Sequence, residues 1–166
     1  MGTSPEEAVQ TLEAIGVDGV GANCGTGIEG FVEICRRLRA ATDLPVWIKP
    51  NAGLPESVDG EVLYRTTPES FARFGPALVE AGVDILHCSR NARVGVPVMP
   101  PLYNPAFARL RERVSVPLIA NGAAFTPDRI AAYMEMGADF VAVARGMLTD
   151  PHYATKAVGG ASGHEA

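Results

Sequence analysis

The residues of this chain that are best suited to chemistry are thiols. Its three cysteines are Cys24, Cys35 and Cys88, and none belongs to a Cys-x-x-Cys pair. An odd number of scattered cysteines argues against a disulfide framework and for a reducing compartment. Cys24 and Cys88 each stand at the end of an apolar run, where a thiolate can serve as a nucleophile or as a zinc ligand. We therefore take both as candidate functional thiols.

His87 directly precedes Cys88 and is a further candidate ligand. Neighbouring positions on a strand point to opposite faces, so these two side chains are poorly placed to bind one ion together. A site made of Cys24 with Cys88, or of Cys24 with His87, supplies at most two of the four ligands that zinc usually takes. The alternative for Cys35 and Cys88 is that they are small buried hydrophobic residues.

Other polar and aromatic residues carry less weight as functional groups. Lys49 ends a predicted strand and is expected to stabilise that end of the fold. His152 is expected to be solvated, and His164 lies in a Gly/Ser-rich terminal segment. Trp47 and Phe140 fall within predicted strands and are expected in the core. We find no Ser/His/Asp spacing and no paired glutamates, so hydrolysis has no positive support.

A repeated sequence pattern predicts the helices and strands that position these residues. Three segments open with Ser or Thr, Pro and an acidic residue, and close with Gly, a small apolar residue and Asp. The hydroxyl caps a helix, proline suits its first turn and glycine ends it. The pattern and the intervening segments predict helices near residues 6–15, 28–41, 68–81, 105–113 and 127–136. Short apolar runs predict buried strands at residues 19–24, 46–50, 85–89, 116–122 and 140–145.

Strict alternation of strands and helices predicts an α/β fold with a parallel sheet. An open nucleotide-binding sheet is typically marked by a Gly-x-Gly-x-x-Gly turn, which is missing here. The repeat of near-equivalent units favours parallel β/α units of the (β/α)8-barrel type, with about five strands and thus an incomplete barrel. We expect a single domain over residues 1–158 and a flexible tail over residues 159–166. Functional residues are then expected where the strands end.

Composition narrows the possible partners. The chain has 166 residues, is 47% hydrophobic and carries a net charge of −5 with no dense basic patch. Nucleic-acid binding is therefore not expected, and a small-molecule substrate is the favoured partner. The N-terminus has neither a basic region nor an apolar signal core, and no apolar run approaches the roughly 20 residues of a membrane span. We expect a cytoplasmic protein without a membrane partner.

The first half contains specific loop motifs: residues 19–25 (Gly-Val-Gly-Ala-Asn-Cys-Gly), residues 49–55 (Lys-Pro-Asn-Ala-Gly-Leu-Pro), Tyr64, and residues 67–72 (Thr-Pro-Glu-Ser-Phe-Ala). In order and spacing, residues 3–85 resemble the homocysteine S-methyltransferase family of zinc-dependent barrels. The resemblance implies methyl transfer to the thiol of homocysteine in methionine biosynthesis and one-carbon metabolism. It also implies that Cys24 is a zinc ligand at the catalytic centre, with Asn23 beside it.

The chain departs from that family at the other zinc ligands. The family supplies two of them from an adjacent Cys-Cys pair after a later strand. At the matching place this chain reads Ile-Leu-His-Cys-Ser-Arg over residues 85–90, so that only Cys88 remains and its register is displaced. The resemblance therefore implies a methyltransferase whose zinc site is degraded.

From residue 82 onward the sequence resembles a second family. Residues 82–157 are similar to the last three β/α units of old yellow enzyme-type FMN oxidoreductases. In that family the loops after the last two strands hold the FMN phosphate, and a phosphate site there is a recurring feature of barrels. Ala123 and Ala144 stand where glycine is common, which crowds a phosphate. The matching positions in this chain are Asn121, Gly122, Ala123, Ala144, Arg145 and Gly146.

Three functions remain open from the sequence: a homocysteine S-methyltransferase-like protein, a flavin-dependent reductase, and a truncated or hybrid barrel without catalysis. We favour the first. Five β/α units leave the two outer strands of the sheet without a neighbour, and exposed strand edges invite association. We therefore expect either a homo-oligomer or completion of the barrel by another chain.

Overall fold

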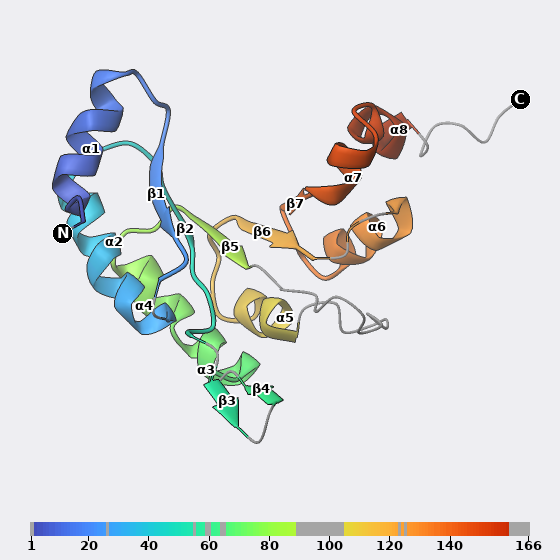
Figure 1. The fold of residues 1–166 in the computed structure, drawn as a ribbon, viewed down its shortest axis with the longest axis horizontal. Helices are drawn as coiled ribbons and strands as arrows, with labels where there is room; N and C mark the ends of the chain where they lie inside the picture. The colour runs from blue at the N-terminus through green and yellow to red at the C-terminus, as the bar shows by residue number, and fades with distance from the viewer. Residues whose placement is uncertain are drawn as a thin grey trace, which may run out of the picture.

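A computed structural model describes residues 2–25, 27–54, 56–58, 61–63, 66–88, 105–122, 124 and 126–159. A five-stranded sheet runs through its centre, with helices around it (Figure 1). Of the positions singled out above, Ala123, Tyr64 and His164 lie outside the described residues, as does the expected tail beyond residue 159.

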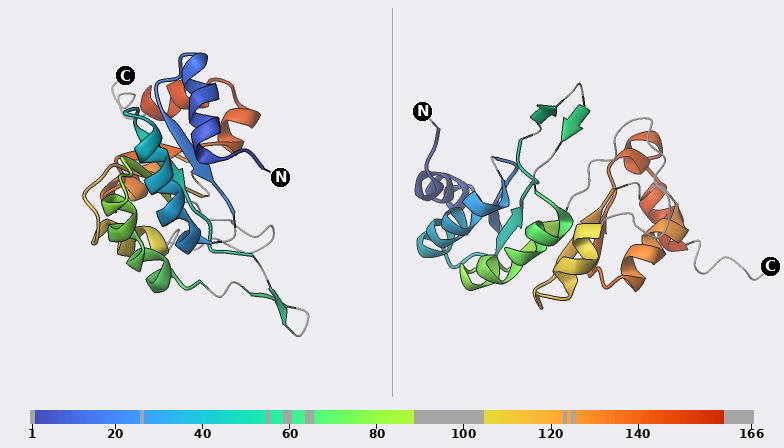
Figure 2. Two further views of the ribbon diagram at one scale, coloured as in Figure 1. Left: turned by 90° about the vertical axis from the view of Figure 1, so that its left-hand side faces the viewer. Right: turned by 90° about the horizontal axis from the view of Figure 1, so that it is seen from below.

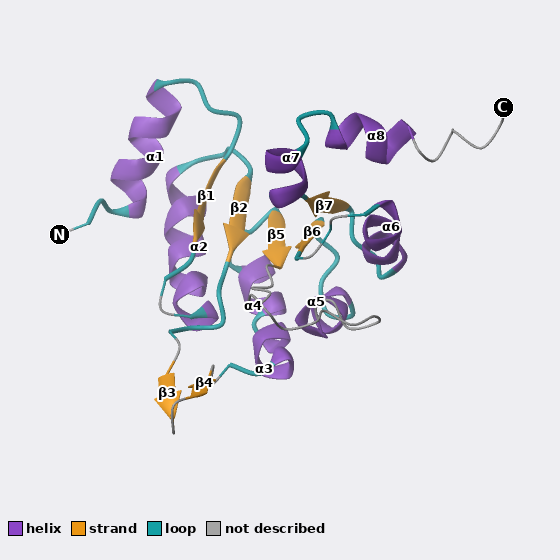
Figure 3. Cartoon of the chain, turned by 45° about the vertical axis from the view of Figure 1, so that its right-hand side comes forward, coloured by secondary structure: helices purple, strands orange, loops and turns teal. Residues whose placement is uncertain are grey.

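All five strands of the sheet are parallel, which confirms the predicted fold class. They are β1 (Val20–Asn23), β2 (Val46–Lys49), β5 (Ile85–Cys88), β6 (Leu118–Asn121) and β7 (Phe140–Ala142). Their order in space is the order in the chain, β1-β2-β5-β6-β7, and the described strands do not close into a barrel (Figure 3). Sequential parallel neighbours joined by helices are the arrangement of barrel units.

Two helices begin with the side-chain caps that the sequence predicts, whereas the Thr126 hydroxyl makes no capping hydrogen bond to the helix that begins at Pro127. Ser4 and Glu7 form a reciprocal capping box at the start of α1 (Pro5–Ala14), and the Thr67 hydroxyl accepts the backbone N–H of Ser70. The other elements are η1 (Ile28–Gly30), α2 (Phe31–Ala41), α3 (Pro68–Arg73), α4 (Gly75–Glu80), α5 (Pro105–Arg111), α6 (Pro127–Glu135), α7 (Arg145–Thr149) and α8 (Tyr153–Gly159). None of the described helices is long and apolar enough to cross a membrane.

Two local features differ from the sequence prediction. The helix expected over residues 68–81 is interrupted between Arg73 and Gly75, because Pro76 has no N–H with which to continue the hydrogen-bond ladder. The segment between β2 and α3 also contains a short antiparallel pair that was not predicted, β3 (Glu56–Val58) with β4 (Glu61–Leu63). This pair projects away from the sheet in both figures that view it from different sides (Figures 1 and 2).

The two faces of the sheet have different environments. Val46, Ile48, Leu86 and Leu118 share one face and are buried in a single core with side chains of α1, α2, α4, α5 and α6. These helices lie along one side of the strands, as the right-hand view of Figure 2 shows. The register places alternate residues on the opposite face, including Gly21, Trp47, Ile85, His87, Ile119 and Phe140.

Trp47 and Phe140 are not core residues, so that expectation was wrong. Their exposed fractions are 46% and 57%. Both lie on the face that would line the inside of a closed barrel, and the described strands leave that face open. An apolar residue in a strand is buried only if a second layer covers its face.

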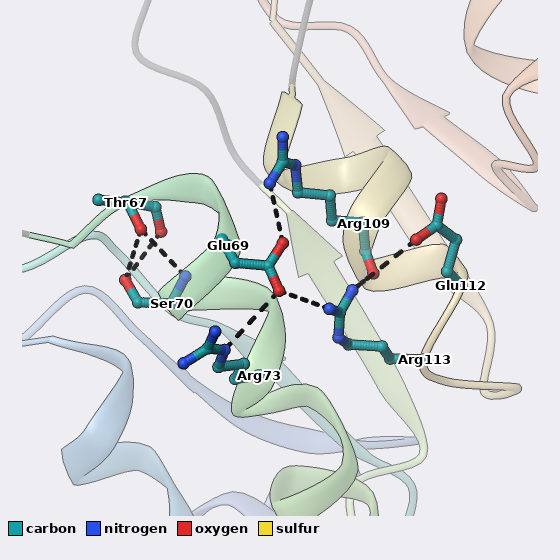
Figure 4. A network of polar contacts seen from close by, with 7 residues as sticks. All are labelled: Thr67, Glu69, Ser70, Arg73, Arg109, Glu112 and Arg113. Atoms are coloured by element: carbon teal, nitrogen blue, oxygen red, sulfur yellow. Dashed lines mark hydrogen bonds and ion pairs between the residues drawn. The ribbon is translucent and has the colours of Figure 1, made fainter.

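An ion-pair network joins the third and fifth helices. Glu69 at the start of α3 contacts Arg109 Nη1 of α5 at 2.8 Å and also pairs with Arg113 and Arg73 (Figure 4). The hydrogen bond from Arg109 is the main reason that the pKa of Glu69 lies below its ordinary value. The network fixes α3 against α5 and thereby orients the units that carry β5 and β6.

Candidate functional site at the strand ends

Cys24 lies directly after β1, at the edge of the sheet where the strands end. Its backbone N–H donates to the carbonyl oxygen of Lys49 at 3.1 Å, and its φ of 64° lies in the left-handed region that ordinary residues seldom adopt. The left-handed turn ends the strand and leaves Cys24 exposed. Asn23 Nδ2 lies 3.1 Å from Cys24 Sγ and donates to it. Strained residues of this kind cluster at functional sites, and here the thiol is accessible.

The loop after β1 is tied to the loop after β2. Asn51 Nδ2 donates to the carbonyl oxygen of Gly25 at 3.0 Å. Asn51 Oδ1 is buried and has no hydrogen-bond partner among the described residues. A buried amide oxygen without a donor is costly, so this position is suited to accept an N–H group from a bound molecule.

Cys88 does not join Cys24. It is 1% exposed and packs in the core on the helix-covered face, where its neighbours in register are Ala120 and Val141. β2 separates β1 from β5, which places the two strands about 9–10 Å apart. The environment of Cys88 is that of a buried hydrophobic residue. Cys35 is also fully buried, and burial raises the pKa of its thiol to about 12.

His87 is a functional candidate that the sequence analysis weighed only as a metal ligand. It lies on the open face of β5, is 5% exposed, and neither ring nitrogen has a hydrogen-bond partner among the described residues. Its ring stacks on Trp47 with centroids 5.8 Å apart. Burial, assisted by the positive charge of Lys49, lowers the pKa of His87 to about 4. The imidazole is therefore neutral at pH 7, with one donor and one acceptor available.

The loops after β6 and β7 lie at the same end of the sheet as Cys24. Asn121 ends β6 and is in register with Ala142 at the end of β7. Tyr133 Oη donates to the carbonyl oxygens of Gly122, at 2.9 Å, and Asn121, at 3.3 Å, which fixes the loop after β6. The strand expected over residues 140–145 is shorter than predicted, and Arg145 instead begins α7.

Small and charged residues follow β7, at the point where α7 begins. Ala144 and Arg145 are exposed, whereas Gly146 is buried. A Cβ added at Gly146 would lie 3.0 Å from Val143 and 3.1 Å from Tyr153, so this position is closely packed. The structure thus places Asn121 and Gly122 at the end of β6, and Ala144 and Arg145 after the neighbouring strand β7.

The family model for homocysteine S-methyltransferase matches residues 1–88, which include β1, β2, β5 and Cys24. The chain belongs to the homocysteine S-methyltransferase family. This confirms the resemblance of residues 3–85. A 55-residue stretch is also 40% identical to methionine synthase from Mycobacterium tuberculosis, and it covers 33% of this chain and 5% of that protein.

Two further similarities extend beyond the segment matched by the methyltransferase family. The chain is 30% identical over 136 residues to NADH oxidase from Thermoanaerobacter brockii, which covers 76% of this chain and 20% of that protein. The chain thus spans a fifth or less of the length of these two relatives. The crystal structure of the BexX/CysO complex from Amycolatopsis orientalis is similar in fold, with a TM-score of 0.57 at 20% identity over 99% of this chain and 67% of that chain.

The residues of this homocysteine S-methyltransferase family member do not fit the zinc site that the family implies. Cys24 is exposed at the end of β1, whereas Cys88 is enclosed in the core and His87 lies on the opposite face of β5. Within the described ranges, no group of three His, Cys, Asp or Glu side chains is placed to hold a metal ion. A tetrahedral zinc site needs four ligands, and Cys24 offers one.

Proposed function

We propose that this chain is a homocysteine S-methyltransferase-like domain that binds a small thiol substrate at the strand ends around Cys24. The observation that carries the proposal is the position of Cys24: an exposed thiol in a left-handed turn after β1, within the segment that the family model matches. The proposal places a small molecule, and neither nucleic acid nor membrane, at this site.

The groups around Cys24 suit an amino-acid ligand that carries sulfur. The buried Asn51 Oδ1 would accept a hydrogen bond from the ligand's ammonium group, which satisfies an otherwise unpartnered atom. Methyl transfer to such a ligand forms a sulfur–carbon bond, breaks the bond between the methyl group and its donor, and releases the thiol proton. The proposal does not require zinc, because Cys24 supplies one ligand and the others would have to come from outside the described residues.

At pH 8 we expect iodoacetamide to alkylate Cys24 at least about a hundredfold faster than Cys35, because only the thiolate form of a cysteine reacts. Burial raises the pKa of Cys35 to about 12, whereas Cys24 is exposed. Saturating methionine, the methylated product of homocysteine, is expected to slow alkylation of Cys24 several-fold by covering its sulfur. Peptide mass mapping of a time course measures both rates.

Alanine provides the matched control, since it has the same amino-acid group without the thioether and is expected to protect Cys24 much less. Equal protection by methionine and alanine, or none by either, would contradict the proposed site. Faster labelling of Cys35 would mean that the end of β1 is misplaced. Metal analysis of the same preparations is expected to show substoichiometric zinc that Cys24→Ser leaves unchanged.

A second function, flavin binding, is favoured by the similarity to NADH oxidase and by the loops after β6 and β7. A glycine backbone and a guanidinium are groups that suit the FMN phosphate, and Gly122 and Arg145 supply them, although the methyl group of Ala144 crowds the approach. FMN would contribute its own redox chemistry there.

If this second function holds, Arg145→Ala is expected to weaken FMN binding about tenfold or more, because a charge-assisted hydrogen bond is lost. Quenching of FMN fluorescence on titration with protein measures the affinity. Arg36→Ala is the control, since Arg36 is an exposed arginine of α2 far along the chain from these loops. An equal loss in both variants would indicate nonspecific attraction of the phosphate.

A further inference from the structure

A repeated contact joins neighbouring strands of the sheet. In the first instance, Asp84 precedes β5, and its Oδ2 accepts the backbone N–H of Val46, the first residue of β2, at 2.8 Å. The backbone N–H of Asp84 donates to the carbonyl oxygen of Val46 at 2.9 Å. Arg39 of α2 donates to the same Oδ2 at 2.9 Å. The stem of Arg39 lies over Gly82, where an added Cβ would be 2.5 Å from its Cγ.

The same contact recurs between β6 and β7. Asp139 precedes β7, and its Oδ2 accepts the backbone N–H of Leu118, the first residue of β6, at 2.8 Å. The backbone N–H of Asp139 donates back to Leu118 at 3.0 Å, and Arg111 donates to Oδ2 at 3.1 Å. The stem of Arg111 lies over Gly137, 3.0 Å from an added Cβ. We call this arrangement of arginine, glycine and aspartate the Gly-x-Asp clamp.

Each clamp joins two kinds of strand. One kind, β5 or β7, follows the Gly-x-Asp sequence. The other kind, β2 or β6, follows an arginine and a proline at the same spacing in both cases: Arg39, Pro45 and Val46, or Arg111, Pro117 and Leu118. The two kinds alternate across the sheet, because β1 also follows a Gly-x-Asp sequence.

Before β1, the glycine and aspartate of a clamp are present, but no described residue provides the arginine or the neighbouring strand. Gly16 has φ +77°, close to the +94° of Gly82, yet nothing lies within 4 Å of a Cβ added there. Asp18 is exposed, and no described residue pairs with its carboxylate. β1 is bonded to β2 on one side only. The glycine, the aspartate and the open strand edge are in place, while the arginine and the partner strand are missing.

We propose that the open edge of β1 is a docking site for a further parallel β/α unit from outside residues 1–166, whose strand follows an arginine and a proline at the spacing of Arg39 and Pro45. The incoming arginine lies over Gly16 and pairs with Asp18. The carboxylate and backbone N–H of Asp18 bind the first residue of the incoming strand, as Asp84 binds Val46. Two observations specify this partner: the negative charge of Asp18 requires an arginine, and the alternation of the two kinds of strand across the sheet requires a strand of the arginine-proline kind beside β1.

A second copy of this chain does not supply that unit at its free edge. The other outer strand is β7, which is of the Gly-x-Asp kind. At the position equivalent to Arg39 and Arg111, β7 is preceded by Tyr133, which is fully buried. The strands with the required arginine and proline, β2 and β6, are both interior. The clamp therefore argues against a homo-oligomer formed through this edge and favours completion by a unit from outside residues 1–166.

The test adds the missing unit to the full chain. A copy of residues 28–66, which contain α2 and β2, is fused directly before Ser4, so that α1 takes the place of α3 and α4 as the following helix. The fusion is expected to raise the midpoint of thermal unfolding by about 2–4 °C or more, since a clamp and a strand pairing are gained. Asp18→Asn is expected to remove most of this gain.

The same substitution in the natural chain is the matched control and is expected to leave the midpoint unchanged, whereas Asp84→Asn lowers it because that clamp is occupied. Circular dichroism establishes that each variant is folded. An equal effect of Asp18→Asn with and without the added unit would overturn the proposal. So would a homodimer, seen by light scattering, that Asp18→Asn dissociates. These readouts are stability and mass, so they are independent of the function proposed for Cys24.

Discussion

The free energy of unfolding is expected to fall by up to about 3 kcal/mol through His87 as the pH is lowered from 7 to 4. Burial holds the pKa of His87 at about 4 in the folded protein, against 6.5 for an unperturbed histidine. Between these values the unfolded state binds the proton first. Stability is therefore complete above pH 6.5 and is lost progressively as the pH falls towards 4.

His87→Phe removes the titrating group while keeping an aromatic ring against Trp47. Urea unfolding of both proteins at several pH values between 7 and 4.5 gives the free energy of unfolding as a function of pH. The difference between the slopes of the two proteins measures the contribution of His87. This range limits the contribution of the carboxylates, and His152→Gln, which removes an exposed imidazole, is expected to keep the natural slope. Parallel pH profiles for the natural protein and His87→Phe would show that His87 is not buried in neutral form.

A single methyl group at Gly21 is expected to destabilise the fold by at least about 3 kcal/mol. A Cβ at this position would lie 1.9 Å from the backbone oxygen of Trp47, and backbone atoms of a paired strand cannot move aside as a flexible side chain can. Gly21→Ala must therefore separate β1 from β2. We expect a large drop in the urea midpoint, or failure to accumulate as folded protein.

Two other glycines give a graded comparison for Gly21→Ala. An added Cβ at Gly19 would lie 3.2 Å from the carbonyl oxygen of Pro45, so Gly19→Ala is expected to have a smaller effect. Nothing lies within 4 Å at Gly2, and Gly2→Ala is expected to be neutral. If Gly21→Ala unfolds at the same urea concentration as Gly2→Ala, the close approach of β1 and β2 is incorrect.

The order of the elements was predictable because the sequence marks their ends chemically. Ser4, Thr67 and the glycines at 16, 82 and 137 all occupy the capping or left-handed positions that their residue types favour. The exposure of Trp47 and Phe140 was not predictable in this way. Their burial depends on closure of the barrel, and a strand's own residues do not report which layers cover it.

The candidate site was predicted in part for the same reason. Cys24 reaches the strand ends because local turn chemistry stops β1 there. Cys88 also ends its strand, but its side chain is enclosed in the core, whereas the left-handed turn exposes Cys24. The sequence analysis took the two as candidate ligands of one metal and did not predict this difference. The burial of His87 is different, because it arises from neighbours on other strands, among them Trp47. Such long-range packing leaves no local signal in the run Ile-Leu-His-Cys.

The Gly-x-Asp clamp also bears on how one chain can contain segments similar to two families. The clamp uses backbone atoms and three residue types at set spacings, and it is the same at Asp84, near the change in resemblance, as at Asp139 beyond it. Units of different ancestry that keep this connector remain compatible as neighbours, whatever the rest of their sequence. Because neighbouring strands are joined by the same hydrogen bonds and ion pair, one β/α unit can replace another in evolution while the pairing of the strands is kept.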